Sequence, residues 1–236
     1  MDIVRTLNQI FDCTCVIYLQ ISCISPKFSI KEINGFNNTG NVCIWPAEEC
    51  LSIFCLENRS IFDGKSVIEL GAGMAGLAGL IVAQACNATD VTLTDGNENS
   101  VNNLNVIIPE NQFKASVTAH KLEWSNKEFD KTSRQYDIAI CADCLFFDEG
   151  RTQLMSTLAK VLKHSGLAIL VAPSRSGTFD DFVHLINNET ESFNQVKKNC
   201  QYSKQIWLRR QQLISCDGSN FDEDKDYPIM MMFTRK

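Results

Sequence analysis

The sequence contains little histidine, and His120, His164 and His184 lie far apart along it. Metal sites that use histidine usually show their ligands at short, regular spacings. Cys13 and Cys15 are too close together for a Cys-x-x-Cys half-site, and no second half follows them. We therefore expect no metal ion in this protein.

Long apolar runs are also missing, and none reaches the ~18 residues that a membrane-spanning helix requires. The apolar stretch 13–24 is similar to the core of a signal peptide, but only one basic residue, Arg5, precedes it and no small-residue cleavage pattern follows. Its Val, Ile, Tyr and Cys content favours a strand. We expect no membrane association and a cytoplasmic location, with the nucleus as a second compartment and secretion as the less favoured alternative.

Positive charge is in deficit, because 22 Lys and Arg residues stand against 28 Asp and Glu residues, for a net charge of −6. Nucleic-acid-binding proteins generally meet the phosphate backbone with a basic surface, so we expect no nucleic-acid partner. The eleven cysteines form an odd number, and several, such as Cys141 and Cys144, lie in apolar runs. This usage is typical of buried free thiols in a reducing compartment.

The pattern that is present is an alternation of short apolar runs and helical periodicity, which begins at Ser66. It indicates an α/β fold with a mostly parallel sheet and helices on both faces. We expect a Rossmann-like, seven-stranded domain over residues 36–236, active as a monomer, and we separate residues 1–35 as an N-terminal segment. The expected strands are 66–70, 91–95, 116–121, 136–141, 166–172, 207–214 and 228–234; the expected helices are 76–85, 98–108, 149–162 and 179–188.

A glycine-rich turn follows the first expected strand, and in such sheets ligands bind at the carboxyl ends of the strands. Gly71, Gly73 and Gly76 satisfy the spacing of a dinucleotide site, and a glycine turn without ligand is the plainer alternative. Glu69 precedes the turn by two residues. A carboxylate there would repel a pyrophosphate and suits a cationic ligand such as S-adenosyl-L-methionine.

Acidic and aromatic residues follow the next strands. Asp95 ends the second strand, where a carboxylate can accept hydrogen bonds from ribose hydroxyls or cap the following helix. Trp124 follows the third strand and either stacks on a base or belongs to the core. Asp143 follows the fourth strand inside an apolar run, where it is either a structural ion-pair partner or a substrate-orienting carboxylate.

Several segments together resemble the seven-stranded protein-lysine methyltransferases often called family 16. They are the glycine loop, Asp95, the Leu-Glu-Trp at 122–124 and the Asp-x-x-Phe at 143–146. The segment 35–46, which ends in Trp-Pro, the Glu-Glu at 48–49 and the segment 94–98 narrow the resemblance to members that methylate calmodulin. The resemblance runs from about Gly35 to the C-terminus.

The resemblance implies S-adenosyl-L-methionine as cofactor, a lysine of calmodulin as substrate and trimethyllysine as product. Carried over by position, the residues that line the cofactor would be Trp45, Glu69, Gly71, Ala72, Gly73, Asp95, Trp124 and Ala142. The catalytic, substrate-facing residues would be Asp143, Phe146 and Phe147. Position 146 is Phe where many relatives have Tyr, so a hydroxyl donor is missing there.

Two alternatives remain at this point. A methyltransferase for another protein or a small molecule would keep every cofactor motif. An NAD-dependent oxidoreductase would use the same loop, but Glu69 and the lack of a clear catalytic His or Tyr-Lys pair disfavour it.

Calmodulin is acidic, so this acidic chain would need a local basic surface to dock it. Residues 196–213 contain no acid, and basic and aromatic side chains alternate there. A solvated face is the plainer interpretation. The basic residues of this stretch are Lys197, Lys198, Lys204, Arg209 and Arg210; the interleaved aromatic residues are Tyr202 and Trp207.

Overall fold

The structure is a computed structural model, which describes residues 19–21, 44–124, 134–198, 200–213, 224 and 227–236. Its centre is a seven-stranded sheet of order β3-β2-β1-β4-β5-β7-β6. β7 runs antiparallel to β5 and β6, and the other pairs are parallel. The strands are β1 (Ser66–Leu70), β2 (Asp90–Asp95), β3 (Ser116–Lys121), β4 (Tyr136–Ala142), β5 (Leu162–Pro173), β6 (Lys197–Lys198) and β7 (Pro228–Thr234). The predicted mostly parallel, seven-stranded sheet is confirmed.

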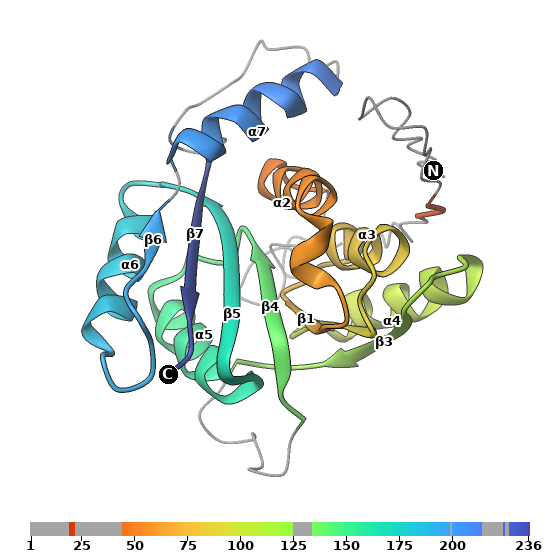
Figure 1. Ribbon diagram of the computed structural model, residues 1–236, viewed down its shortest axis with the longest axis horizontal. Helices are drawn as coiled ribbons and strands as arrows, with labels where there is room; N and C mark the ends of the chain where they lie inside the picture. Colours follow the sequence, from red (N-terminus) through yellow and green to blue (C-terminus); the bar gives the residue numbers. More distant parts are fainter. Residues whose placement is uncertain (1–18, 22–43, 125–133, 199, 214–223, 225–226) are drawn as a thin grey trace.

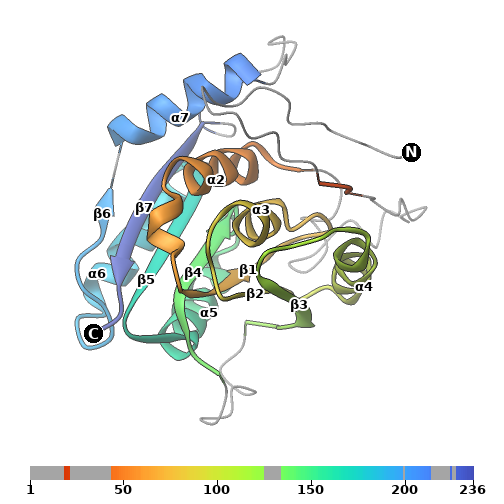
Figure 2. The ribbon, with the colours of Figure 1, turned by 45° about the vertical axis from the view of Figure 1, so that its right-hand side comes forward.

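Helices cover both faces of this sheet (Figures 1 and 2). One apolar core contains side chains of α2, α3, α4 and α7, and the other contains side chains of α5 and α6. The helices are α2 (Pro46–Glu57), α3 (Leu77–Ala85), α4 (Glu98–Ile107), α5 (Asp148–Val161), α6 (Thr178–Asn188) and α7 (Cys200–Leu213), with short 3-10 turns at Arg59–Phe62 and Ile108–Glu110.

The two periodicities of the sequence explain these layers. β1 is buried at every position because helices lie on both its faces. In α6 the buried residues are Phe179, Phe182, Val183 and Ile186, which is the helical spacing of one apolar face. The order of the strands reverses between β1 and β4, so the carboxyl ends of these two strands define the switch point where ligands bind.

The predicted strand at 207–214 is wrong, because residues 200–213 form the helix α7. Its buried residues Ser203, Ile206, Trp207 and Arg210 recur at i, i+3, i+4 and i+7, which is a helical face. The abundance of Gln, Lys, Arg and Leu in this segment also favours a helix. The predicted strand did not take this helical period into account.

Other differences concern elements that were not predicted. α2 was left unassigned, and β6 is a two-residue edge strand too short to give a pattern. β5 begins at Leu162, which pairs with Tyr136. It therefore starts before the predicted strand 166–172 and includes the residues between that strand and the predicted helix 149–162.

The predicted strand at 13–24 lies largely outside the described residues. Residues 19–21 are described and are not in a strand. Leu19 packs into the core, and the backbone of Gln20 exchanges hydrogen bonds with the Asn111 side chain. Within the described part of the chain, no helix has the length and apolar character needed to cross a membrane.

Candidate active site

The glycine loop after β1 has a backbone that only glycine adopts without strain. Gly71, Gly73 and Gly76 have φ values of 71°, 59° and 54°. A Cβ atom at Gly71 would lie 2.7 Å from the Sγ of Cys144 and 3.2 Å from the indole of Trp124. The loop therefore combines a left-handed backbone with close packing against the ends of β3 and β4.

Asp95, at the end of β2, holds the same loop. The Gly73 N–H donates to its Oδ2 at 2.9 Å, and the Asn97 N–H donates to its Oδ1 at 2.8 Å. Burial raises the pKa of Asp95, and these two backbone donors offset part of that effect. The helix cap that was the alternative role for Asp95 belongs instead to Asn97, whose side chain accepts from the N–H groups of Asn99 and Ser100.

Glu69 lies beneath the loop and is only 1% exposed. Its Oε2 accepts from the Gly79 N–H of α3 at 2.9 Å, whereas its Oε1 is a buried oxygen without a hydrogen-bond partner in the described residues. Its side chain therefore faces α3. The sequence pattern predicted that this carboxylate faces a cationic ligand, and this geometry does not support direct contact.

A second buried carboxyl, Glu48 of α2, stands beside Glu69 and accepts from the Ala78 N–H at 2.9 Å. Burial raises the pKa of Glu48 to about 7, and burial followed by the charge of Glu48 raises that of Glu69 well above its usual range. One proton shared between the two carboxyls would supply the donor that Oε1 of Glu69 lacks. The pair thus joins α2, β1 and α3 under the cofactor loop.

Cys144 ties the ends of β1 and β4 together. Its thiol donates to the Ala142 carbonyl at 3.1 Å and lies 3.6 Å from the Leu70 carbonyl. Ala142 is buried at the end of β4, and Trp124 packs at the margin of the core beside Gly71. The predicted cofactor residues of β1, β2, β3 and β4 therefore meet at one edge of the sheet. Further described cysteines are also buried and free, namely Cys50, Cys55, Cys86 and Cys141.

Asp143 follows β4 with a left-handed backbone, at a φ of 54°. Its side chain is 7% exposed, and Arg175 binds both of its oxygens, at 2.5 and 2.8 Å. A non-glycine residue in this backbone region is uncommon and is found disproportionately at functional sites. The structural ion pair and the functional carboxylate, which the sequence left as alternatives, are thus compatible here.

Aromatic rings surround this ion pair. The Arg175 guanidinium lies 5.7 Å from the ring centre of Trp45 and 5.9 Å from that of Phe146. Phe146 in turn packs against Phe147, with ring centres 4.7 Å apart. The sequence-predicted residues Trp45, Asp143, Phe146 and Phe147 therefore form one cluster, although they come from two distant segments of the chain.

The loop fits S-adenosyl-L-methionine by its own chemistry. A left-handed glycine backbone lets a ligand approach closely, and Asp95 offers carboxylate oxygens next to it. Gly71, Gly73 and Asp95 would hold the cofactor, which supplies the methyl group. In the parts of the chain that the structure describes, no three His, Cys, Asp or Glu side chains form a group suited to a metal ion.

Sequence reasoning missed Arg175 and Glu48 as parts of this site. Arg175 lies two residues beyond the end of β5, so the rule that selected residues after the first four strands would also have selected it. Glu48 gave no such signal, because its partner Glu69 is 21 residues away and the contact depends on how α2 packs.

Several known proteins are similar to this chain in sequence. A family model described as lysine methyltransferase matches residues 25–198. A calmodulin-lysine N-methyltransferase of Arabidopsis thaliana is 33% identical over 89% of this chain and 70% of its own length. The human protein-lysine N-methyltransferase EEF2KMT is 28% identical over 55% of this chain and 42% of its own length.

Solved structures share the fold at low sequence identity. The N-methyltransferase NodS of Bradyrhizobium japonicum, in complex with S-adenosyl-L-homocysteine, superposes with a TM-score of 0.53 at 14% identity, over 87% of this chain and 95% of its own. A ribosomal protein L11 methylase of Lactobacillus delbrueckii gives a TM-score of 0.53 at 14% identity, over 79% of this chain and 77% of its own.

Proposed function

Because this chain belongs to the lysine methyltransferase family and takes its methyl group from S-adenosyl-L-methionine, we propose that its acceptor is a lysine side chain of calmodulin, which it converts to trimethyllysine. The observation that carries this proposal is the similarity to the Arabidopsis thaliana calmodulin-lysine N-methyltransferase along most of the chain. The relatives matched over only half of the chain support lysine methylation and leave the acceptor open.

The chemistry is a displacement at the methyl carbon. The lone pair of the lysine nitrogen forms a bond to that carbon, while the carbon–sulfur bond breaks and its electron pair stays on the sulfur. The nitrogen must be neutral, yet the usual pKa of lysine is about 10.4, so the amine has to lose a proton to water before each transfer. Alignment of nitrogen, carbon and sulfur can supply about 7–11 kcal/mol of the barrier reduction.

The aromatic cluster suits an amine that becomes more methylated at each step. Trp45 and Phe146 lie against the Arg175 guanidinium that binds Asp143, and Phe147 packs on Phe146. Aromatic faces attract methylated ammonium groups. Each such contact contributes about 0.5–2 kcal/mol and needs no hydrogen-bond donor on the ligand. A site of this kind keeps its attraction for the side chain after the first and second methyl groups are added.

The basic docking surface predicted from residues 196–213 has to be smaller than expected. Arg210 is buried and forms an ion pair with Glu49 of α2 at 2.6 Å, so it stabilises the fold. Lys198 is paired with Asp180. Lys197 and Lys204 are exposed and are the better candidates for contact with an acidic protein.

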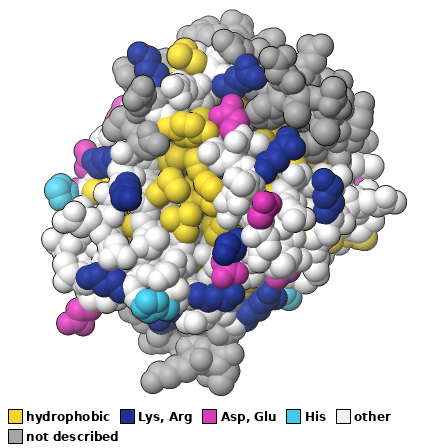
Figure 3. All heavy atoms as spheres, in the orientation of Figure 1, with side chains coloured by type: hydrophobic (Ala, Val, Ile, Leu, Met, Phe, Trp, Pro, Cys, Tyr) yellow, Lys and Arg dark blue, Asp and Glu magenta, His cyan; other side chains and the backbone are white. Residues whose placement is uncertain are grey.

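The position of Lys197 supports this choice. It lies opposite Met232 across the β6–β7 ladder, so both side chains stand on the sheet face that carries α2 and α7. On the side of the molecule shown in Figure 3, an apolar patch has Lys and Arg side chains, and a smaller share of Asp and Glu, around it. Basic groups around an apolar surface match a partner that is acidic and exposes hydrophobic side chains.

Incubation of the protein with S-adenosyl-L-methionine and calmodulin, followed by intact-mass spectrometry, tests the proposal. We expect calmodulin to gain up to three methyl groups. Lys197→Glu/Lys204→Glu should raise the KM for calmodulin and leave cofactor affinity unchanged, and the effect should shrink as salt screens exposed charges. Calmodulin that keeps its mass throughout would contradict the proposed acceptor.

A further inference from the structure

Arg175 occupies a defined place between the elements of the candidate site. It follows β5, and its guanidinium donates to both oxygens of Asp143 in a bidentate pair. It also lies over the rings of Trp45 and Phe146. The resemblance assigned Asp143 and Phe146 to the substrate side and Trp45 to the cofactor, so Arg175 lies where the two sides meet. The cation nearest to Asp143 is thus supplied by the chain itself.

Burial makes a cation necessary at Asp143. The side chain of Asp143 is 7% exposed and that of Arg175 is 25% exposed. A carboxylate taken out of water is strongly unfavourable unless a cation and hydrogen bonds compensate it, and removal of one partner leaves an uncompensated buried charge. Without Arg175, a substrate lysine entering this site would bring its ammonium next to the Asp143 carboxylate.

The backbone around Arg175 keeps it in place. Three consecutive residues, Arg175, Ser176 and Gly177, have positive φ values of 41°, 58° and 92°. The Arg175 N–H donates to the Asp224 carbonyl at 2.8 Å, and the Ser176 N–H donates to the Asp224 carboxylate at 2.7 Å. Strained backbone persists only where surrounding contacts hold it, so this turn fixes the point from which the guanidinium reaches Asp143.

We propose that Arg175 is the built-in counterion of Asp143, a positioning residue whose charge lets the substrate lysine enter the aromatic site as a neutral amine. This inference rests on the lysine methyl transfer proposed above and holds for any protein acceptor. It also resolves a difficulty of the site, since a bare carboxylate beside the amine would stabilise the ammonium form, which has no lone pair to donate. With Arg175 bound, the pair carries no net charge, and Asp143 still presents oxygens that can orient an N–H group.

The pH dependence of turnover tests this role, because kcat against pH reports groups in the enzyme–substrate complex. In Arg175→Gln the Asp143 carboxylate, without the compensating charge of Arg175, would hold the lysine as ammonium. An opposite charge at this range shifts a pKa by about 1–3 units, so the rising limb of the profile should move at least about one unit to higher pH. Turnover at pH 7 should fall by roughly tenfold or more, and the deficit should shrink as the pH is raised. Cofactor affinity, measured by calorimetry, should stay within a few-fold.

Two further variants separate this role from a structural one. Asp143→Asn/Arg175→Gln removes both charges, so its profile should return toward the wild-type position even if its rate is low. Arg134→Gln breaks another Arg–Asp pair, with Asp90 at the opposite edge of the sheet, and should leave the profile where it is. An Arg175→Gln profile that is lowered at every pH without displacement would overturn the proposal.

A measurement of stability, which needs no substrate, tests the Asp143–Arg175 pair even if calmodulin is not the acceptor. Unfolding free energies of Asp143→Asn, Arg175→Gln and the double variant form a cycle, and we expect a clearly non-additive result, with the double variant more stable than the sum of the single losses predicts. Additive losses would show that the pair does not form in solution and would overturn the proposal. Absence of wild-type turnover on calmodulin, with coupling intact, would contradict the acceptor alone.

Discussion

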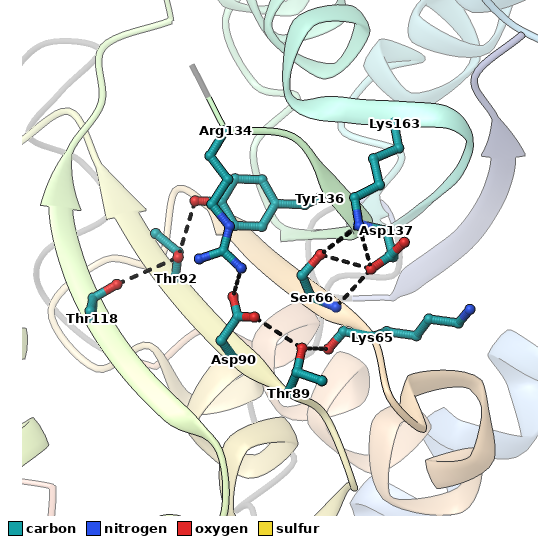
Figure 4. A network of polar contacts seen from close by, with 10 residues as sticks. All are labelled: Lys65, Ser66, Thr89, Asp90, Thr92, Thr118, Arg134, Tyr136, Asp137 and Lys163. Atoms are coloured by element: carbon teal, nitrogen blue, oxygen red, sulfur yellow. Dashed lines mark hydrogen bonds and ion pairs between the residues drawn. The ribbon is translucent and has the colours of Figure 1, made fainter. Parts of the chain in front are cut away.

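Acidic residues lie in opposite electrostatic conditions at the two ends of the parallel strands. We call the side of the sheet where these strands begin the amino edge and the side where they end the carboxyl edge. At the amino edge, Asp137 of β4 accepts from the Ser66 N–H and hydroxyl and pairs with Lys163 (Figure 4). Burial alone would raise the pKa of Asp137, but these donors outweigh it and lower the pKa to about 2. At the carboxyl edge, burial raises the pKa of Asp95, Glu48 and Glu69.

This difference indicates that the amino edge stabilises the fold and that the carboxyl edge carries the chemistry. Figure 4 shows contacts at the amino edge that reach across β1, from the start of β4 to β2, namely Arg134 with Asp90 and the Tyr136 hydroxyl with Thr92. At the carboxyl edge the acids bind backbone N–H groups of loops and helix starts, and one oxygen of Glu69 has no partner in the described residues. Perturbed acids in such surroundings are typical of functional sites.

The largest expected effect lies at the carboxyl edge. Asp143→Ala should lower lysine methylation by at least ~100-fold, the size expected for loss of a positioning or proton-transfer group. Cofactor affinity should change no more than a few-fold, because the Asp143 carboxylate binds Arg175, whereas Asp95 holds the glycine loop. Single-turnover kinetics and calorimetry on the folded variant check both values. Intact turnover would make Asp143 purely structural.

The second effect is the pH-dependent contribution of Glu48 to the stability of the fold. A carboxyl whose folded pKa is about 7 binds its proton more tightly when folded, so its contribution to stability is present below the unfolded value near 4.5 and is lost as the pH rises through about 7. Glu48→Gln should remove that loss and stabilise the protein at pH 8 by about 1–3 kcal/mol. Denaturant unfolding of variant and wild type at about pH 5 and about pH 8 measures this difference in unfolding free energy. Parallel curves for variant and wild type would show that the buried pair does not titrate.

A smaller effect is expected at Asp95. Asp95→Ala removes the carboxylate that holds Gly73 and that faces the cofactor site, so affinity for S-adenosyl-L-methionine should fall by about tenfold or more, or ~1.4 kcal/mol. Wild-type affinity should be in the micromolar range, about −8 kcal/mol, with NAD far weaker. Calorimetry on wild type and variant measures both affinities. An unchanged affinity for S-adenosyl-L-methionine in Asp95→Ala would show that Asp95 does not contribute to cofactor binding.

The smallest effect belongs to the amino edge. Asp137 has a folded pKa of about 2, so its contribution is present above the unfolded value near 3.8 and is lost as the pH falls through about 2. The pair with Lys163 is partly exposed, so Asp137→Asn should cost no more than ~1 kcal/mol at neutral pH and leave turnover unchanged. Thermal unfolding and a methylation assay on the same preparation check this. A fall in turnover comparable to that of Asp143→Ala would contradict the claim that the amino edge serves stability alone.

The sequence predicted the parts of the molecule that depend on local pattern. The boundaries of β1 and β3 agree with the structure to the residue, and the cluster of Trp45, Asp143 and Phe146 was anticipated from strand ends and resemblance. These features repeat a short-range period or follow a strand directly. The strand predicted over residues 207–214 overlaps α7, whose buried positions at helical spacing begin upstream of that range.

What could not be predicted depends on packing between distant segments. Glu69 was expected to face a cation, but α3 packs over β1 and turns that carboxylate into a buried contact with Gly79. Arg210 was expected on the surface, but α7 crosses α2 and brings it to Glu49. In both cases the partner is chosen by the tertiary arrangement, which no local period encodes.

The most direct test of the account is a competition in one reaction. Calmodulin and excess free lysine are offered together to the wild-type protein with S-adenosyl-L-methionine, and tandem mass spectrometry locates the methyl groups. The account predicts a single calmodulin lysine that progresses to the trimethylated form, with free lysine unmodified. Methylated free lysine beside unmodified calmodulin would contradict it.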